Sequence, residues 1–158
     1  MELRTESPDE TREVAAAIAR LSRAGDVVLL TGDMGAGKTV FAQGFGAALG
    51  VSGTMTSPTF TLVNTYECER VSLHHADLYR LERTGEVADL ALAELAEFGG
   101  ILLVEWGEAA ADVVRDHLEV HLEAVDDSDD RAIDIVPVGA TWLQRIDRLT
   151  AAVGGFAC

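Results

Sequence analysis

The stretch that decides the fold is Gly-Asp-Met-Gly-Ala-Gly-Lys-Thr, at residues 32–39. It matches G-x-x-x-x-G-K-[ST] at every fixed position, which is the spacing of a phosphate-binding loop. In such a loop the glycines let successive backbone N–H groups turn toward a polyphosphate. The lysine, here Lys38, reaches the β- and γ-phosphates, and the hydroxyl of the threonine, here Thr39, can coordinate Mg²⁺. We therefore expect this loop to bind the phosphates of a nucleotide.

The residues on both sides of the loop supply the context that it needs. Residues 26–31 (DVVLLT) are a short apolar run rich in β-branched residues, which is typical of a buried parallel strand. Residues 40–49 have a helical pattern, with Phe41, Phe45 and Leu49 on one face. The N-terminus of this helix would point at the phosphates and add its dipole. The order strand, loop, helix favours a nucleotide-binding loop over a simple glycine-rich turn.

Length and composition limit the other possibilities. The 158 residues are enough for one domain with a substantial core, and a hydrophobic fraction of 48% argues against disorder. The formal charge of −15, from 12 basic and 27 acidic residues, opposes direct binding of tRNA or DNA. Docking onto a basic partner protein is easier, although the charge alone also serves solubility.

Several features argue against a secreted protein, a membrane protein and a metal site built from cysteine or histidine ligands. The sequence shows no signal segment and no apolar run as long as a membrane span, so we expect a cytoplasmic location. Cys68 and Cys158 lack the spacing of metal ligands. His117 and His121 are four residues apart, but on an alternating strand they would share the polar face about 13 Å apart, so we discount a metal site.

Strand and helix patterns continue along the rest of the chain. We expect further strands at residues 3–5, 60–67, 71–78, 101–106, 117–125 and 131–138. We expect helices from residue 8 to about residue 24, at 86–98 and at 141–153, with one or two helical turns at 108–114. With no repeat or linker, residues 1–158 read as one α/β domain. It would be a three-layer, P-loop NTPase-like domain whose mixed sheet has a parallel core, added antiparallel strands and flanking helices.

Two carboxylates are candidates for chemistry beside the loop. Glu105 follows the apolar run 101–104, so it fits the second Mg²⁺ contact that such loops use, or an ordinary strand end exposed to water. Asp77 ends the alternating run 71–78 and could orient water or a metal-bound water, or cap the following turn. Trp106 could pack over the site or cap the core.

Other polar residues leave two interpretations open. His75 could titrate near neutral pH or be structural, and Arg80 could contact phosphate or pair with a carboxylate. Ser57-Pro58-Thr59-Phe60 lies where a γ-phosphate-sensing switch can occur, or is a turn entering a strand. The acidic run 126–130 lacks the Gly and Glu of an EF-hand and is expected to be a solvated hairpin turn.

Four blocks in this order make a family resemblance. They are the loop at 32–39, Ser-Pro-Thr-Phe at 57–60, His-x-Asp-Leu-Tyr-Arg at 75–80 and Val-Glu-Trp at 104–106. Together they resemble the TsaE (YjeE) family, small bacterial ATPases of tRNA threonylcarbamoyladenosine synthesis, from about Ser7 to Arg131. Departures are small: Met34 stands where Leu is more usual, and Gly107 replaces a common Pro.

The resemblance implies a mixed seven-stranded sheet with flanking helices. It also implies ATP with Mg²⁺ as ligands, and slow hydrolysis coupled to a complex of the partner proteins TsaB and TsaD. That complex would transfer the threonylcarbamoyl group to adenosine 37 of tRNA. This chain would therefore meet tRNA only indirectly, through the complex.

The resemblance also implies roles for individual residues. Thr39 and Glu105 would bind Mg²⁺, and Asp77 and Glu105 would act in hydrolysis. Ser57 and Thr59 would belong to a switch loop. The implied ATP-binding residues are Thr11, Asp33, Met34, Gly35, Ala36, Gly37, Lys38, Thr39, Trp106 and Arg131.

Three other functions remain open at this point. A small-molecule kinase would need an arginine-rich lid, for which only Arg80 and Arg83 are suitably placed. A GTPase would need an Asn-Lys-x-Asp motif, which the sequence lacks. A non-hydrolytic, ATP-dependent assembly switch would use the same binding residues, so only measured turnover separates it from an ATPase.

Overall fold

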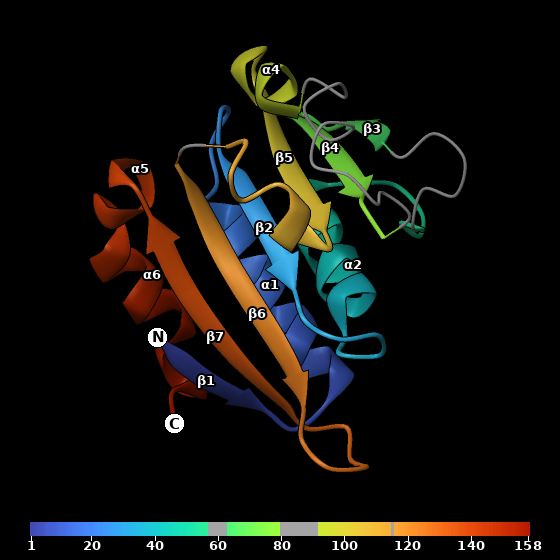
Figure 1. Cartoon of the computed structure of the whole chain (residues 1–158), viewed down its shortest axis with the longest axis vertical. Helices are drawn as coiled ribbons and strands as arrows, with labels where there is room; N and C mark the ends of the chain where they lie inside the picture. The colour runs from blue at the N-terminus through green and yellow to red at the C-terminus, as the bar shows by residue number, and fades with distance from the viewer. Residues whose placement is uncertain (57–62, 80–91, 115) are drawn as a thin grey trace.

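The computed structural model describes residues 1–56, 63–79, 92–114 and 116–158 (Figure 1). The strands are β1 (Glu2–Thr5), β2 (Val27–Thr31), β3 (Val63–Glu67), β4 (Ser72–Asp77), β5 (Gly100–Glu105), β6 (His117–Ala124) and β7 (Arg131–Val138). The helices are α1 (Pro8–Leu21), α2 (Lys38–Leu49), α4 (Leu92–Glu97), α5 (Ala140–Leu143) and α6 (Ile146–Val153). Two short 3₁₀ turns are η1 (Gly107–Ala109) and η2 (Gly154–Phe156).

The strands form one seven-stranded mixed sheet in the order β1-β7-β6-β2-β5-β4-β3. The four central strands, β6, β2, β5 and β4, are parallel to one another. Antiparallel strands extend the sheet at both edges: β7 and β1 beyond β6, and β3 beyond β4. The expected parallel core with antiparallel additions is confirmed.

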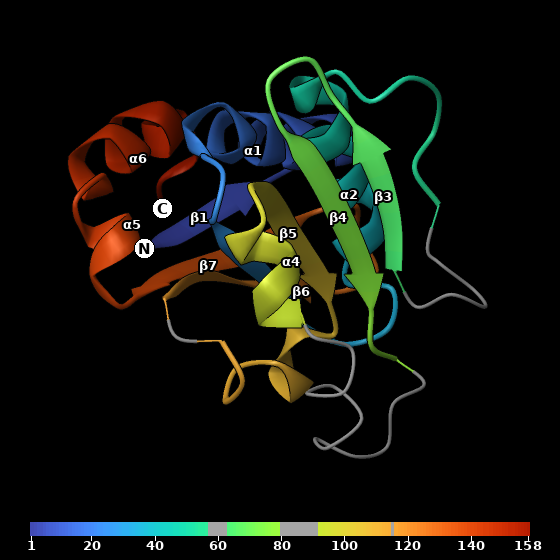
Figure 2. The same ribbon diagram turned by 90° about the horizontal axis from the view of Figure 1, so that it is seen from above.

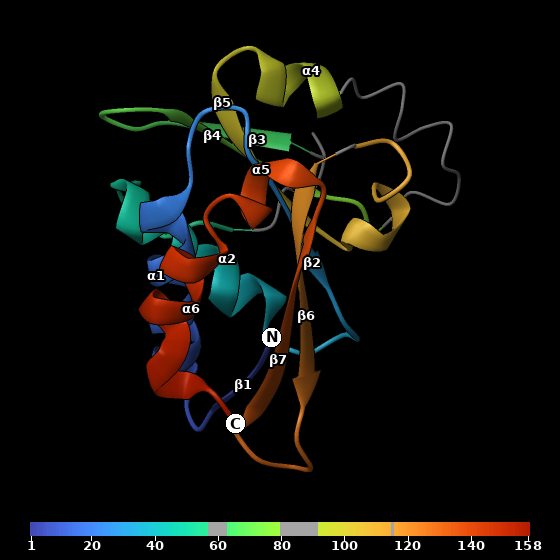
Figure 3. The ribbon, with the colours of Figure 1, turned by 90° about the vertical axis from the view of Figure 1, so that its left-hand side faces the viewer.

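Helices cover both faces of the sheet, which gives the three layers (Figures 2 and 3). Successive residues of a strand point to opposite faces. Accordingly Val28 and Leu30 of β2 join the core under α1, α2 and α6, while Val27 and Leu29 join a second core under α4 and η1. All five residues of β2 are buried, because a central strand covered on both faces has no solvent side.

The start of α1 follows the sequence signal, but its end does not. Ser7 caps the helix by accepting a hydrogen bond from the backbone N–H of Glu10. The helix stops at Leu21 rather than near Ala24, because Ser22 is extended and its backbone N–H and hydroxyl donate to carbonyls of the last turn. The predicted C-terminus was therefore about three residues too late.

The predicted helix 141–153 is two helices, α5 and α6, with Arg145 at the break. The side chain of Arg145 is buried and forms a bidentate ion pair with Asp26, at 2.7 and 2.8 Å. Elsewhere the predicted elements differ mainly at their ends. Residues 60–62 and 86–91 of two predicted elements lie outside the described residues. None of the described helices is long and apolar enough to cross a membrane.

Candidate nucleotide-binding site

The loop at residues 32–39 connects the carboxyl end of β2 to the first turn of α2. Gly32, Gly35 and Gly37 have φ angles of 130°, 80° and 103°, a region that side chains with a Cβ rarely adopt. A Cβ on Gly32 would also collide with the backbone oxygen of Leu122 in β6. The backbone path therefore favours glycine at all three positions, and the close approach of β6 requires it at Gly32.

The side chain of Lys38 folds back over its own loop. Its Nζ donates to the carbonyl oxygens of Gly32 (2.5 Å) and Asp33 (2.8 Å), and lies 3.8 Å from the centroid of the Trp106 ring. Burial lowers the pKa of the Lys38 amine, and nearby carboxylates, Glu108 first, oppose that shift. The amine is thus held over the loop by groups that carry no full negative charge.

Glu105 points at the loop and not at the solvent. It is the last residue of β5, next to β2 in the sheet, and its side chain is almost fully buried. One carboxylate oxygen accepts a hydrogen bond from the hydroxyl of Thr39 (3.0 Å), and the other is 2.7 Å from Nε2 of His75 in β4. His75 is fully buried, and its Nδ1 has no hydrogen-bond partner among the described residues. The parallel strands β4 and β5 therefore position Glu105 against Thr39.

Asp77 lies beside Glu105, because the two residues are paired in the register of β4 and β5. Asp77 is half-buried, and its Oδ1 accepts a hydrogen bond from the backbone N–H of Tyr79 (3.0 Å). It thus caps the following turn, as one of the two interpretations expected, and it also lines the pocket described next.

A pocket of about 350 Å³ brings most of the predicted site together. It is lined by Met34, Gly35, Gly37, Lys38, Thr39, Val40, Asp77, Tyr79, Glu105, Trp106 and Arg131. Asp33 and Ala36 contribute backbone carbonyls around it: Asp33 accepts from Lys38, and Ala36 accepts from Nε of Arg131 (2.9 Å). Ser57 and Thr59 lie outside the described residues, as do Arg80 and Arg83.

Thr11 lies next to this pocket but does not line it. It lines a smaller cavity that shares Gly37, Val40 and Arg131 with the main one. Its buried hydroxyl lies 2.8 Å from the hydroxyl of Thr5 and donates to the carbonyl oxygen of Ser7 (3.3 Å). Arg131, from the start of β7, reaches across to the loop and also donates to the carbonyls of Ser128 and Asp130.

Trp106 has φ 59°, the left-handed region, and this conformation accompanies a ring that lies over Lys38. The ring of Tyr79 lies 4.9 Å from it, centroid to centroid. Tyr79, Val40 and Glu108 lie at the site but are not among the residues predicted for it. The carboxylate of Glu108 accepts from the backbone N–H of Gly32 (3.3 Å). Tyr79 lies within the block at residues 75–80, and this is the one feature of the sequence that could have indicated its place at the site. His117 and His121 lie on one face of a single strand, β6, as expected, but they differ in exposure: His117 is buried, whereas His121 is exposed and its Nδ1 lies 2.9 Å from the hydroxyl of Thr31.

Comparisons with known proteins agree with one another. The family model described as "Threonylcarbamoyl adenosine biosynthesis protein TsaE" matches residues 5–133. The protein named tRNA threonylcarbamoyladenosine biosynthesis protein TsaE of Bacillus subtilis is 37% identical over 148 residues, which are 93% of this chain and 92% of the relative. A protein of the same name from Mycobacterium bovis is 42% identical over 130 residues, 75% of this chain and 72% of the relative.

A solved structure matches in the same way. The crystal structure of YdiB from Bacillus subtilis superposes with a TM-score of 0.79 at 32% sequence identity, over 96% of this chain and 94% of that one. The family match and the identities over most of the chain show that this chain belongs to the TsaE family, as the four sequence blocks predicted.

Proposed function

We propose that this chain binds ATP with Mg²⁺ in the pocket at residues 32–39 and hydrolyses it slowly, as an ATPase of tRNA threonylcarbamoyladenosine biosynthesis. One observation carries the proposal: the hydroxyl of Thr39 is hydrogen-bonded to the buried carboxylate of Glu105, at 3.0 Å. A hydroxyl and a carboxylate facing each other at the mouth of a phosphate-binding loop are the oxygen ligands that Mg²⁺ uses in such loops.

The residues present fit a bound triphosphate. Positive φ angles at Gly35 and Gly37 curve the loop so that its backbone N–H groups can face a phosphate. Helix α2 begins at Lys38, directly after Gly37, so its N-terminus adds a favourable dipole there. The Lys38 amine is satisfied by two neutral carbonyls, so it can exchange them for phosphate oxygens, which are stronger partners. Tyr79 and Trp106 supply aromatic surface at the rim.

The carboxylates of Asp77 and Glu105 are close enough to repel a polyphosphate unless a cation intervenes. When bound, Mg²⁺ neutralises phosphate charge and favours transfer of the γ-phosphoryl group. Within this arrangement Thr39 and Glu105 would hold the cation, and His75 would fix the orientation of Glu105. Asp77, on the neighbouring strand, would orient the attacking water.

The arginine content of the pocket supports the proposal that ATP hydrolysis depends on a partner protein. Arg131 is the one arginine that lines it among the described residues, and its guanidinium is occupied by the carbonyls of the loop and the β6–β7 turn. The arginine that often accelerates phosphoryl transfer is thus expected from another protein. TsaB and TsaD are the proposed partners, and tRNA would be contacted indirectly, since the net charge of −15 opposes a polyanion.

The proposal is tested by measuring ATP turnover and tRNA retention for this chain alone, for a TsaB–TsaD mixture, and for all three together. We expect slow turnover and no tRNA retention by the chain alone, with faster turnover in the mixture of three. A second mixture with Lys38→Ala controls for contaminating ATPases. Full turnover by the chain alone, or no change on adding TsaB and TsaD, would overturn the partner dependence.

A further inference from the structure

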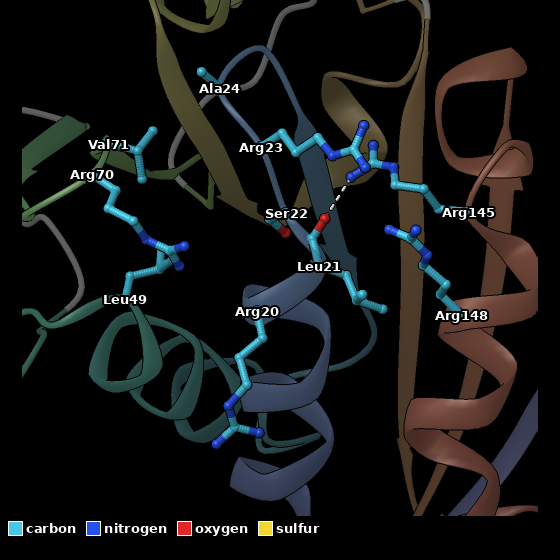
Figure 4. A pocket seen from close by; sticks show the side chains of 10 residues that line it. All are labelled: Arg20, Leu21, Ser22, Arg23, Ala24, Leu49, Arg70, Val71, Arg145 and Arg148. Atoms are coloured by element: carbon cyan, nitrogen blue, oxygen red, sulfur yellow. Dashed lines mark hydrogen bonds between the residues drawn. The ribbon is translucent and has the colours of Figure 1, made fainter.

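Five arginines line a second pocket, at the opposite end of the sheet from the phosphate-binding loop. This pocket, the arginine pocket, has a volume of about 300 Å³, and its arginines are Arg20, Arg23, Arg70, Arg145 and Arg148 (Figure 4). No carboxylate side chain lines it among the residues that the structure describes. Ser22 and Arg23 precede β2, and Arg70 precedes β4. Because β2 and β4 both run parallel to β5, the amino-terminal ends of these strands lie together, opposite to the carboxyl ends that carry the first site.

The concentration of positive charge is unusual for this chain. Acidic residues outnumber basic ones by 27 to 12, and no lysine contributes to the arginine pocket. The other basic residues that the structure describes are used elsewhere. Arg4 pairs with Asp130 and Arg12 with Asp9, while Lys38 and Arg131 contact the phosphate-binding loop. Those four are the described basic residues outside the arginine pocket.

Arg145 provides a rigid, buried frame for the pocket. Its guanidinium donates to both carboxylate oxygens of Asp26 and to the carbonyl oxygen of Leu21, and stacks 4.1 Å from the centroid of Trp142. These contacts tie the start of α6, which carries Arg148, to the segment that carries Arg23. The positive charge of Arg145 itself is neutralised by Asp26, so it does not provide the free charge of the pocket.

The side chains of Arg23, Arg70 and Arg148 have no ion pair or hydrogen bond with any other part of the chain that the structure describes. In Figure 4, Arg23 and Arg148 lie on the same side as Arg145, and Arg70 faces them from the opposite side. Arg20 extends away along α1, so we do not count it. Like charges brought together from three separate segments repel one another unless an anion lies between them.

The geometry points to an oligophosphate, that is, two or more linked phosphates either free or on a nucleotide, as the ligand of the arginine pocket. Planar guanidinium groups bind phosphate through paired N–H donors, which suits three arginines around a small cavity. A compact anion is favoured over RNA, because the basic residues outside the pocket that the structure describes are already engaged, so they offer no continuing basic track to a long phosphate backbone.

This site is independent of the proposed ATPase function, so the test first disables phosphate binding at residues 32–39 with the substitution Lys38→Ala. Inorganic triphosphate is titrated by calorimetry, without metal, into Lys38→Ala and into Lys38→Ala carrying Arg23→Gln and Arg148→Gln. A charge-matched control carries Arg4→Gln and Arg12→Gln instead, since both of those arginines are on the surface. Parallel titrations with ADP and with tRNA distinguish a nucleotide and an RNA from the free oligophosphate.

We expect Lys38→Ala to retain one saturable triphosphate site, and the arginine-pocket variant to lose at least about tenfold in affinity, because two charged hydrogen-bond donors are removed. The control should change less than about twofold. Arg70→Gln, on a different segment, should weaken binding as well, and thermal melting checks that each variant is folded. Absence of a saturable site, an equal loss in the control, or binding of tRNA but not of triphosphate would each overturn the inference.

Discussion

Replacing Glu105 by Gln changes one charge at the centre of the first site and preserves the side-chain volume. Glu105 is almost fully buried and its two carboxylate oxygens face Thr39 and His75, at 3.0 and 2.7 Å. The amide of Gln can face both residues, because the Thr39 hydroxyl can turn and accept from the amide nitrogen. The variant should therefore fold, and its effect should report on charge rather than on packing.

The free energy of unfolding without ligand should fall by about 1–2 kcal/mol. Two hydrogen bonds to a charged acceptor, each contributing about 1.5–3 kcal/mol, become neutral bonds of about 0.5–1.5 kcal/mol. Part of this loss is offset because an amide costs less to bury than a carboxylate. Urea denaturation of both proteins without nucleotide measures the difference.

The effect on ATP affinity should have opposite signs with and without Mg²⁺. Removing a negative charge about 8 Å from phosphate is worth about 1–2 kcal/mol at an effective dielectric of about 20–40, so metal-free ATP should bind roughly five to thirty times more tightly. With Mg²⁺ the variant loses an anionic ligand for the cation, so its affinity should be lower than that of the wild type. Titration calorimetry in EDTA and in Mg²⁺ measures both.

Glu108→Gln is the matched control, since Glu108 lies by the loop but accepts from the backbone N–H of Gly32 and does not contact Thr39. It should ease the repulsion of metal-free ATP and leave the tightening by Mg²⁺ unchanged. The reasoning fails if Glu105→Gln keeps the wild-type response to Mg²⁺, or if Glu108→Gln loses that response to the same extent.

Three further predictions concern other residues. Asp77→Asn should slow ATP hydrolysis in the TsaB–TsaD mixture by at least about tenfold while ATP affinity changes little, and unchanged turnover would remove Asp77 from the reaction. Trp106 lies over Lys38, whereas Trp142 is in the core. MgATP should therefore alter the tryptophan fluorescence of the wild type and not that of Trp106→Phe, and a fluorescence change that persists in Trp106→Phe would contradict the position of Trp106 at the nucleotide site. Asp26→Asn should lower the free energy of unfolding by roughly 3 kcal/mol, because Arg145 stays buried without its counter-ion, and urea denaturation with little change would show that the pair is dispensable.

The sequence predicted the strands and the phosphate-binding loop well, because both depend on local pattern. The alternation of apolar residues and the glycines at positions with positive φ are readable without tertiary contacts. The proximity of Glu105 to Thr39 could also be predicted from the sequence, since a carboxylate at the end of a strand parallel to β2 must lie near the loop. The four sequence blocks, taken in their order, also predicted the family.

The features that were missed depend on contacts between distant segments. The final helix breaks at Arg145, whose side chain binds the carbonyl oxygen of Leu21 at the end of α1 and the carboxylate of Asp26, which lies 119 residues away in the sequence. The arginines of the arginine pocket come from three separate segments and form no motif in the sequence. The turn of Trp106 over Lys38 uses a backbone conformation that its residue type does not favour.

The most direct test of the central claim is a calorimetric titration of MgATP into two full-length proteins that both carry Arg23→Gln and Arg148→Gln, which disable the arginine pocket, one with Lys38 and the other with Lys38→Ala. The account predicts one saturable site in the protein that keeps Lys38, and affinity too weak to measure in the protein with Lys38→Ala, with the same far-UV circular dichroism and melting behaviour for both. The prediction rests on Lys38 as the cation that folds over the loop and is free to exchange its carbonyl partners for phosphate. Equal affinity in the two proteins would contradict the assignment of residues 32–39 as the ATP site.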